Sequence, residues 1–235
     1  MVSVMEYHVR VIDVFPRGDS AFSVRFERPP TFSFQPGQYM FITPGTDTSV
    51  QTKHLSISSS PSDQYLEVTK GSTGHPFAES LRALKSGDEA VIVGPYGEFT
   101  FQGEHSKVAF LAGGIGVTPL WSMIRYATDM LYDTDITLLY SAKTEPNILF
   151  QERMTDVAEA NPHLSLVLTL TEPDPSWAGH TGRIDRVMIE QEVPDWRDRI
   201  FFTSGPLAMV DAMLAVLREM GVPDDKVRYE YFSGY

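Results

Sequence analysis

The segment that constrains the fold most strongly is residues 108–130, VAFLAGGIGVTPLWSMIRYATDM. It begins with a short apolar run, residues 108–111, which is typical of a buried strand. Three glycines follow within residues 113–116, and glycine lets the backbone turn tightly and approach a ligand closely. Thr118 and Pro119 then occupy the positions expected for a helix N-cap and a first helical residue. Apolar residues at helical spacing predict the helix itself: Leu120, Ile124, Ala127 and Leu131.

A strand, a glycine turn and a helix in this order are typical of a pyrophosphate site. The free N–H groups at the start of the helix and the positive end of its dipole both face the anion. The spacing differs from the full G-x-G-x-x-G fingerprint, so an ordinary tight turn in an α/β domain is the alternative interpretation.

The second half of the chain alternates between predicted strands and helices, after a polar segment at residues 102–106. Strands are expected at residues 136–140, 164–170, 200–203 and 227–231, and helices at residues 150–160, 185–193 and 207–220. This alternation indicates a doubly wound, mostly parallel sheet, in which ligands bind at the carboxyl ends of the strands.

The first hundred residues follow a different pattern. Short alternating segments predict six strands, at residues 5–15, 20–27, 38–43, 55–58, 65–70 and 90–93, and one helix from Pro76 to about residue 86. Many short antiparallel strands with frequent turns indicate a barrel or a sandwich. We therefore predict an antiparallel, six-stranded β barrel with one helix in residues 1–103. A doubly wound parallel α/β domain is expected to follow in residues 104–235.

Composition excludes several classes of function. The net charge of -12 argues against a nucleic-acid partner and against an anionic membrane surface. The chain contains no Cys, which rules out thiolate catalysis and Cys-ligated iron–sulfur clusters within it. No metal-ligand cluster or nucleophile–base pair is visible among the motifs, so we expect no metal site and no hydrolase. We recognise no signal peptide and no membrane-spanning run, and expect a cytoplasmic protein.

Two polar segments in the first half have the composition of ligand-binding loops. Residues 53–60, KHLSISSS, place hydroxyl and basic groups on a predicted strand edge, where they can bind a polar ring system or a phosphate. Residues 70–80, KGSTGHPFAES, lead through two glycines into a helix start, which is a second possible anion site. A solvated edge strand and a plain loop with a helix cap are the alternative interpretations.

In their order along the chain, these segments resemble the ferredoxin–NADP reductase family of flavoproteins. The resemblance covers nearly the whole chain and rests on six motifs: KHLSISSSP (53–61), HPFAESL (75–81), GDEAVIVGPYGEF (87–99), AGGIGVTP (112–119), SGPLAMV (204–210) and EYFSGY (230–235). It implies an FAD-binding barrel and an NAD(P)-binding domain, with hydride transfer from the nicotinamide to flavin N5. Electrons would then pass singly to an acceptor.

The resemblance also implies roles for individual residues. It assigns the flavin and its phosphates to Lys53, His54, Leu55, Ser56, Ser58, Lys70, Gly74, His75, Pro76 and Phe77. It assigns the nicotinamide nucleotide to Gly113, Gly114, Gly116, Thr118, Ser141, Lys143, Gly205 and Pro206. Ser56, Ser204 and Glu230 are the expected catalytic residues, and Tyr235 is expected to shield the flavin.

The choice of nucleotide depends on the end of the second parallel strand. NAD-specific folds often place an acidic residue there to hold the ribose hydroxyls. Here the strand ends in Ser141 and Lys143, which favour a 2′-phosphate and therefore NADPH over NADH. Arg183 is a second candidate for the same phosphate.

Three functions are consistent with these patterns. The first is an FAD-dependent NAD(P)H oxidoreductase that passes electrons to a separate carrier such as ferredoxin or flavodoxin. The second is a flavin reductase that releases its flavin, which would fit the departures of Lys53 and Leu55 from the family's Arg and Tyr. The third is a non-catalytic regulatory subunit that keeps the fold.

Overall fold

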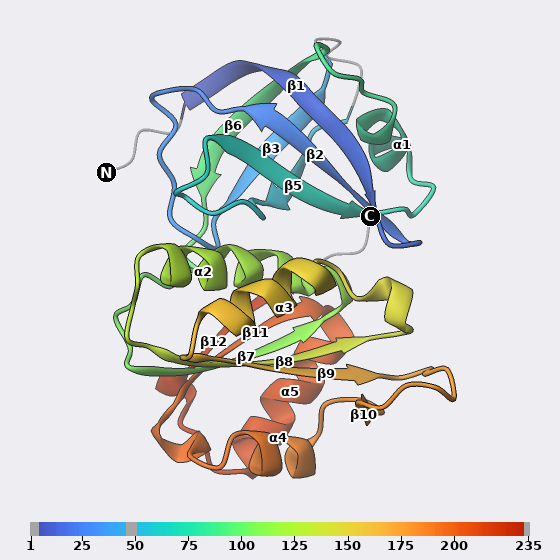
Figure 1. Cartoon of the computed structure of the whole chain (residues 1–235). Coiled ribbons are helices and arrows are strands. Elements are labelled where there is room, and N and C mark those ends of the chain that lie inside the picture. Colours follow the sequence, from blue (N-terminus) through green and yellow to red (C-terminus); the bar gives the residue numbers. More distant parts are fainter. Residues whose placement is uncertain (1–4, 46–50, 233–235) are drawn as a thin grey trace.

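The computed structural model describes residues 5–45 and 51–232. It contains two six-stranded sheets, one in each half of the chain, which form the upper and lower layers in Figure 1. The first sheet is antiparallel throughout and the second parallel throughout. The predicted fold class is therefore confirmed.

The upper layer is a barrel that closes on itself through one short contact. Its strands are β1 (Met5–Arg17), β2 (Ala21–Glu27), β3 (Tyr39–Pro44), β4 (Lys53–Ser56), β5 (Tyr65–Gly71) and β6 (Glu89–Tyr96), with α1 (Pro76–Arg82). They follow the order β4-β3-β6-β1-β2-β5, and a bridge between Ile57 and Val68 joins the two edges. Strand β1 pairs with β6 and then with β2, with a register shift between Val11 and Asp13. Such a bulge bends a strand, which here helps the sheet to curl.

The lower layer is a parallel sheet with helices on both faces. Its strands are β7 (Lys107–Gly113), β8 (Asp135–Ala142), β9 (Leu164–Leu170), β10 (His180–Thr181), β11 (Ile200–Pro206) and β12 (Val227–Phe232). Its α-helices are α2 (Val117–Asp129), α3 (Gln151–Ala160), α4 (Arg186–Glu192) and α5 (Leu207–Glu219), and its 3-10 turns are Gly114–Gly116, Glu145–Asn147, Trp196–Asp198 and Asp224–Lys226. Helices α2 and α3 lie between the sheet and the barrel, and α4 and α5 cover the other face (Figure 1).

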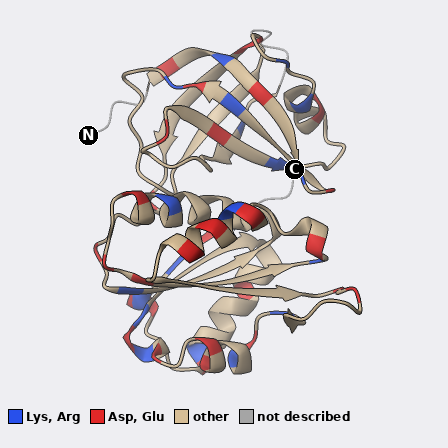
Figure 2. Ribbon diagram, viewed as in Figure 1, with Lys and Arg blue, Asp and Glu red and all other residues tan. Residues whose placement is uncertain are grey.

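The strand order of the lower sheet, β10-β9-β8-β7-β11-β12, contains a topological switch point. The chain moves outward from β7 through β8 and β9 to β10, and then crosses back to add β11 and β12 on the other side. Ligands in open α/β sheets bind at the carboxyl ends of the strands where the order reverses. The central strands carry few charged residues, which are mainly on the helices and loops (Figure 2), as expected for strands buried on both faces.

Three local predictions around the helices are wrong. Thr118 is not an N-cap, because a 3-10 turn precedes α2 and the Thr118 hydroxyl donates to the carbonyl of Ile115 at 3.0 Å. Leu131 does not lie on the apolar face of α2: it follows the helix, has a left-handed φ of 55° and is 86% exposed. Phe150 precedes α3 with a φ of 61°, and its ring stacks on that of Trp121, with ring centroids 5.5 Å apart.

Strand β10 was not predicted from the sequence. It has only two residues, which is too short to show an alternation of apolar and polar side chains.

Hydrogen bonds and an ion pair between α2 and the segment after β4 connect the barrel to the parallel sheet. The hydroxyl of Ser122 donates to the carbonyl of Ser59 at 2.6 Å, and Arg125 pairs with Asp63 at 3.1 Å. The hydroxyl of Ser60 donates to Asp129 at 2.8 Å. Because all three barrel residues follow β4 directly, this strand is held in a fixed position relative to α2.

A buried carboxylate forms a second connection between the layers. Glu67 on β5 is almost fully buried and accepts hydrogen bonds from Arg17 at 2.7 Å and Arg25 at 2.8 Å. Arg153 on α3 lies 3.9 Å from the same carboxylate. Burial opposes ionisation of Glu67, but the arginines outweigh it and hold its pKa below the usual value.

The two layers are joined by the loop between β6 and β7. This loop contains residue 103, where we predict the domain boundary, and that boundary stays a prediction. Phe99 and Phe101 in the loop contact Phe202 on β11, with ring centroids 5.6 and 5.9 Å apart. The last residues of the predicted barrel domain, residues 1–103, therefore pack against the core of the parallel sheet.

Candidate functional site

The glycine turn, residues 113–116, is shaped by close packing against the end of β11. A Cβ atom on Gly116 would lie 2.3 Å from the carbonyl oxygen of Ser204 and 2.4 Å from Cα of Gly205. Ser204 is fully buried, and its hydroxyl donates to the carbonyl of Gly116 at 2.5 Å. Only glycine fits at position 116, and the hydrogen bond from Ser204 holds the turn in place.

Gly114 has a different reason to be glycine. Its φ is 52°, a left-handed conformation that glycine adopts without strain, and a Cβ atom there would meet no atom within 4 Å. The space beside it belongs to a cavity rather than to the core. The same turn therefore packs tightly on one side and faces open volume on the other.

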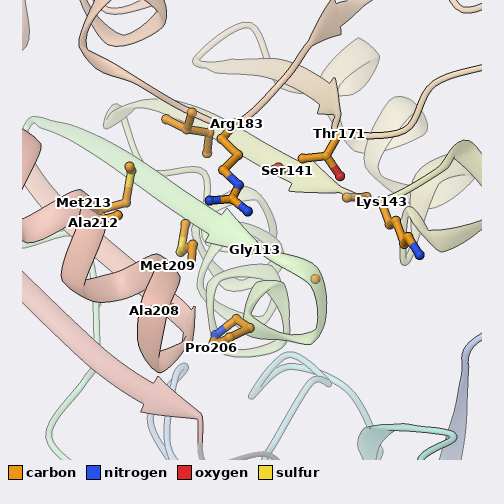
Figure 3. A pocket seen from close by; sticks show the side chains of 13 residues that line it. Gly113, Ser141, Lys143, Thr171, Arg183, Pro206, Ala208, Met209, Ala212 and Met213 are labelled. Atoms are coloured by element: carbon orange, nitrogen blue, oxygen red, sulfur yellow. The ribbon is translucent and has the colours of Figure 1, made fainter.

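A cavity of about 330 Å³ opens at the carboxyl edge of the parallel sheet (Figure 3). We call it the edge cavity, and its lining residues come from the ends of β7, β8 and β9, from the segment after β10 and from the start of α5: Gly113, Gly114, Ser141, Ala142, Lys143, Thr171, Arg183, Ile184, Pro206, Ala208, Met209, Ala212 and Met213. The structure thus brings together five of the residues predicted to bind a nucleotide. Met209 and Met213 on α5 line this cavity as well.

A second cavity, of about 200 Å³, lies between the barrel and the parallel sheet. This interdomain cavity is lined by both layers: Tyr39, His54, Leu55, Ser56, Thr69, Lys70, Gly71, Thr73, Ile115, Thr118, Pro206, Glu230, Tyr231 and Phe232. Seven of these are predicted site residues, including Ser56 and Glu230. Five of the others lie within the motifs quoted above without having been singled out, namely Gly71, Thr73, Ile115, Tyr231 and Phe232. Tyr39 and Thr69 lie outside those motifs.

Aromatic rings surround the barrel side of the interdomain cavity. Tyr39 stacks on Tyr96, with ring centroids 5.8 Å apart and planes inclined by 18°. The ring of His54 lies 5.1 Å from that of Tyr39. This cluster supplies flat apolar surface beside Leu55, where the family motif has a tyrosine.

The interdomain cavity contains a carboxyl group with an altered acidity. Burial raises the pKa of Glu230 to about 7, and its Oε2 atom is buried with no hydrogen-bond partner among the described residues. On the barrel side, burial lowers the pKa of Lys70. Burial and then the charge of Lys53 lower the pKa of His54. A polar ligand that offered an acceptor or donor to Glu230 would satisfy the orphaned oxygen.

The two cavities adjoin at one residue. Pro206, at the end of β11, lines both of them. Residues of the glycine turn also line both cavities: Gly113 and Gly114 line the edge cavity, and Ile115 lines the interdomain cavity. Two ligands bound in the two cavities would therefore meet at Pro206.

The other predicted flavin-phosphate residues lie around the start of α1. Gly74 has a φ of 68°, and a side chain there would meet nothing within 4 Å. The hydroxyl of Ser72 and Nδ1 of His75 are buried without hydrogen-bond partners among the described residues. Phe77 is buried in the barrel core and anchors the helix that Pro76 begins. These two buried polar atoms could form hydrogen bonds with a polar ligand such as a phosphate.

Some predicted site residues line neither cavity. Ser58 is buried, and its hydroxyl donates to the carbonyl of Glu67 at 3.1 Å inside the barrel. Gly205 packs against the carbonyl of Gly113, which a Cβ atom would approach to 3.1 Å. Lys53 begins β4 outside both linings. Tyr235 lies outside the described residues. The roles of all four stay predictions.

Domain models describe both halves of the chain. Residues 5–100 match the model of the FAD-binding domain, and residues 110–214 match the model of the oxidoreductase NAD-binding domain. Both matches describe a flavin and nicotinamide-nucleotide protein. The predicted cofactors, FAD and a nicotinamide nucleotide, are confirmed by these matches.

Known proteins with related sequences are reductase components. A glycine betaine monooxygenase reductase subunit from Chromohalobacter salexigens is 32% identical over 214 residues, which cover 88% of this chain and 58% of that protein. A propane 2-monooxygenase reductase component from Rhodococcus jostii is 28% identical, with 99% of this chain and 65% of that protein covered. The chain thus spans about three fifths of the length of these relatives.

The fold also matches solved structures. The crystal structure of a ferredoxin NADP+ reductase from Neisseria gonorrhoeae, with bound FAD and NADP, superposes with a TM-score of 0.83 at 16% identity. The match covers 98% of this chain and 99% of that one. From these domain models, relatives and fold, the chain belongs to the ferredoxin–NADP reductase-like family of flavoproteins.

Proposed function

We propose that this chain is an FAD-dependent NAD(P)H oxidoreductase that moves a hydride from the nucleotide to the flavin and then passes electrons to a separate carrier. The observation that carries the proposal is the junction at Pro206. A nucleotide in the edge cavity and a flavin in the interdomain cavity would bring their reacting rings together there. Such contact is the proximity that hydride transfer requires.

The residues of the interdomain cavity fit a flavin ring. FAD, when bound, supplies the ability to accept a hydride and release electrons one at a time. Ser56 and Lys70 offer a hydroxyl and an ammonium donor, and Glu230 offers a carboxyl that is about half protonated near neutral pH. Ile115 and Phe232 exclude water from the same space. These groups orient the ring and hold a proton close to it.

The three predicted catalytic residues take two different roles in this proposal. Ser56 and Glu230 line the interdomain cavity and can touch a ligand there. Ser204 lines neither cavity, and its hydroxyl is bound to the carbonyl of Gly116. We therefore assign Ser204 as a positioning residue, which holds the glycine turn at the junction.

A separate electron acceptor is part of the proposal. The two relatives named above are called a reductase subunit and a reductase component, which places each of them in a system of several proteins. This chain contains no Cys and therefore no Cys-ligated iron–sulfur cluster of its own. A ferredoxin or a flavodoxin is the type of carrier that we propose.

The experiment is the visible absorption spectrum of the desalted protein, followed by anaerobic addition of NADPH or NADH and then of ferricyanide. We expect a flavin spectrum that bleaches with nucleotide and returns with the one-electron acceptor. A colourless protein that oxidises NAD(P)H only with added free flavin would contradict tight FAD binding and indicate a flavin reductase. Absence of both flavin binding and turnover would indicate the non-catalytic subunit.

A further inference from the structure

Helix α2 connects the two cavities to the barrel. It begins directly after the glycine turn and then runs beneath the barrel (Figure 1). Thr118 in its first turn lines the interdomain cavity, and Gly114, just before the helix, lines the edge cavity. Ser56, at the end of β4 in the barrel, also lines the interdomain cavity. The distance between β4 and the start of α2 therefore sets the width of this cavity.

One face of α2 carries the side chains that contact the segment after β4. Ser122, Arg125 and Asp129 follow Thr118 by four, seven and eleven residues, which is the spacing of a single helix face. At a rise of about 1.5 Å per residue, Ser122 lies about 6 Å along the helix from Thr118, and Asp129 lies about 16 Å from it. Of these three residues, Ser122 is thus the nearest to the cavity.

The contact of Ser122 is also more enclosed than the other two. Its hydroxyl donates to the carbonyl of Ser59 at 2.6 Å, and both residues are buried. The ion pair of Arg125 with Asp63 is partly exposed to solvent, and so is Asp129. Because Ser59 has almost no contact with solvent, water cannot replace the hydroxyl of Ser122 as its donor.

Ser59 transmits this contact to β4. It follows Ser56 by three residues, and its own hydroxyl accepts a hydrogen bond from the backbone N–H of Glu67 on β5 at 3.0 Å. The N–H of Ser58 donates to the carbonyl of Glu67 at 2.8 Å. The segment after β4 is therefore held between β5 and α2, and a displacement of this segment would move Ser56.

We propose that Ser122 is a positioning residue for hydride transfer, whose hydrogen bond to Ser59 holds β4, and with it the flavin ring, at a fixed distance from the glycine turn. Ser122 lines neither cavity, so it acts through the backbone of Ser59. A displacement of reacting groups by about 1 Å can slow a reaction about 100-fold. This inference rests on the proposed function, because it assumes a flavin in the interdomain cavity and a nucleotide in the edge cavity.

The first measurement is amide hydrogen exchange in residues 53–58 of the full chain as purified. Ser122→Ala is compared with the wild type. Asp129→Ala is the matched control, because Asp129 accepts a hydrogen bond from Ser60 between the same two segments, at the far end of α2. We expect Ser122→Ala to accelerate exchange in residues 53–58 about tenfold, and Asp129→Ala to accelerate it less than about threefold.

The second measurement is anaerobic rapid mixing of the FAD-loaded proteins with NADPH or NADH. In Ser122→Ala, the rate of flavin reduction at saturating nucleotide should fall about 10- to 100-fold. The nucleotide Kd and the flavin content should change less than about threefold. The long-wavelength charge-transfer absorbance of the nicotinamide against the flavin should weaken in the same variant. Asp129→Ala should keep the wild-type rate within about threefold, together with the wild-type absorbance.

Three outcomes would overturn the inference. Ser122→Ala could reduce its flavin as fast as the wild type does, or the two variants could show equal changes. Ser122→Ala could also fail to bind FAD at saturating concentration, in which case the hydrogen bond serves the fold rather than the reaction.

Failure of the proposed function gives a different result. Wild-type protein would then bind no FAD, or its flavin would not be reduced by either nucleotide. The comparison of hydrogen exchange would still decide whether Ser122 holds β4 in place.

Discussion

The replacement of Glu230 by Gln tests the electrostatics of the interdomain cavity. An exposed glutamate in the unfolded chain ionises around pH 4.5, whereas burial raises the pKa of Glu230 to about 7 in the folded protein. Between these values the folded state binds more protons than the unfolded state. Stability therefore falls as the pH rises from about 4.5 to about 7, and the full cost of the buried charge is present above that range.

The size of the effect follows from the shift in pKa. Each unit is worth about 1.4 kcal/mol, so the complete shift corresponds to about 3 kcal/mol. Gln has nearly the same shape and no charge. The free energy of unfolding of Glu230→Gln, relative to the wild type, should therefore rise by about 2 kcal/mol between pH 5 and pH 8.5.

The assay is urea unfolding of both proteins at the two pH values, at equal flavin content. Other titrating groups are common to both proteins and cancel in the difference. Glu219→Gln, which removes a carboxylate at an exposed position on α5, is the matched control for the loss of one charge. A Glu230→Gln difference that stays the same within about 0.5 kcal/mol would refute the reasoning, because Glu230 would then titrate as it does in the unfolded chain.

Two further predictions concern the interior. Glu67→Gln leaves the half-buried Arg17 and Arg25 without their carboxylate, and should lower the free energy of unfolding by about 3 kcal/mol in urea at pH 7. A loss below about 1 kcal/mol would contradict the role of these ion pairs. Gly116→Ala forces a Cβ atom against the carbonyl of Ser204 and should destabilise the protein by more than 2 kcal/mol, whereas Gly114→Ala meets only open space and should cost about 1 kcal/mol in the same assay. Equal effects of the two alanines would show that packing does not distinguish the two glycines.

Much of the fold could be predicted because strands and helices that bury one face carry apolar residues at regular intervals in the sequence. Alternation predicted the barrel strands, and apolar runs predicted the central parallel strands, since a strand buried on both faces needs little polar surface. Strand β9 lies at Leu164–Leu170, the predicted range. Local capping was predicted less well. Thr118 has the sequence of an N-cap, but the 3-10 turn that packs against Ser204 leads directly into the helix, which begins at Val117, two residues before the predicted Pro119.

The candidate site could be predicted in its motifs and not in its geometry. Gly114, Ser56 and Glu230 each belong to a recognisable segment, and the structure places all three beside a cavity. The sequence does not indicate that Ser204 faces the glycine turn rather than a ligand. The sequence also favours Lys143 over Arg183 as the residue that binds a 2′-phosphate. It does not reveal the ion pair between Lys143 and Glu172, because these two residues are distant along the chain.

The amino-acid sequence by itself therefore determined the two types of fold and the order of their main elements, because strand and helix periods and glycine turns depend on residues that are close in sequence. The cofactors followed from the resemblance of its motifs to a known family. Only the tertiary structure decided where the two cavities meet, which basic side chain points into the edge cavity and which carboxyl group has a raised pKa. Each of these properties arises from burial between segments far apart in the chain, such as β4, the glycine turn and β12 around the interdomain cavity.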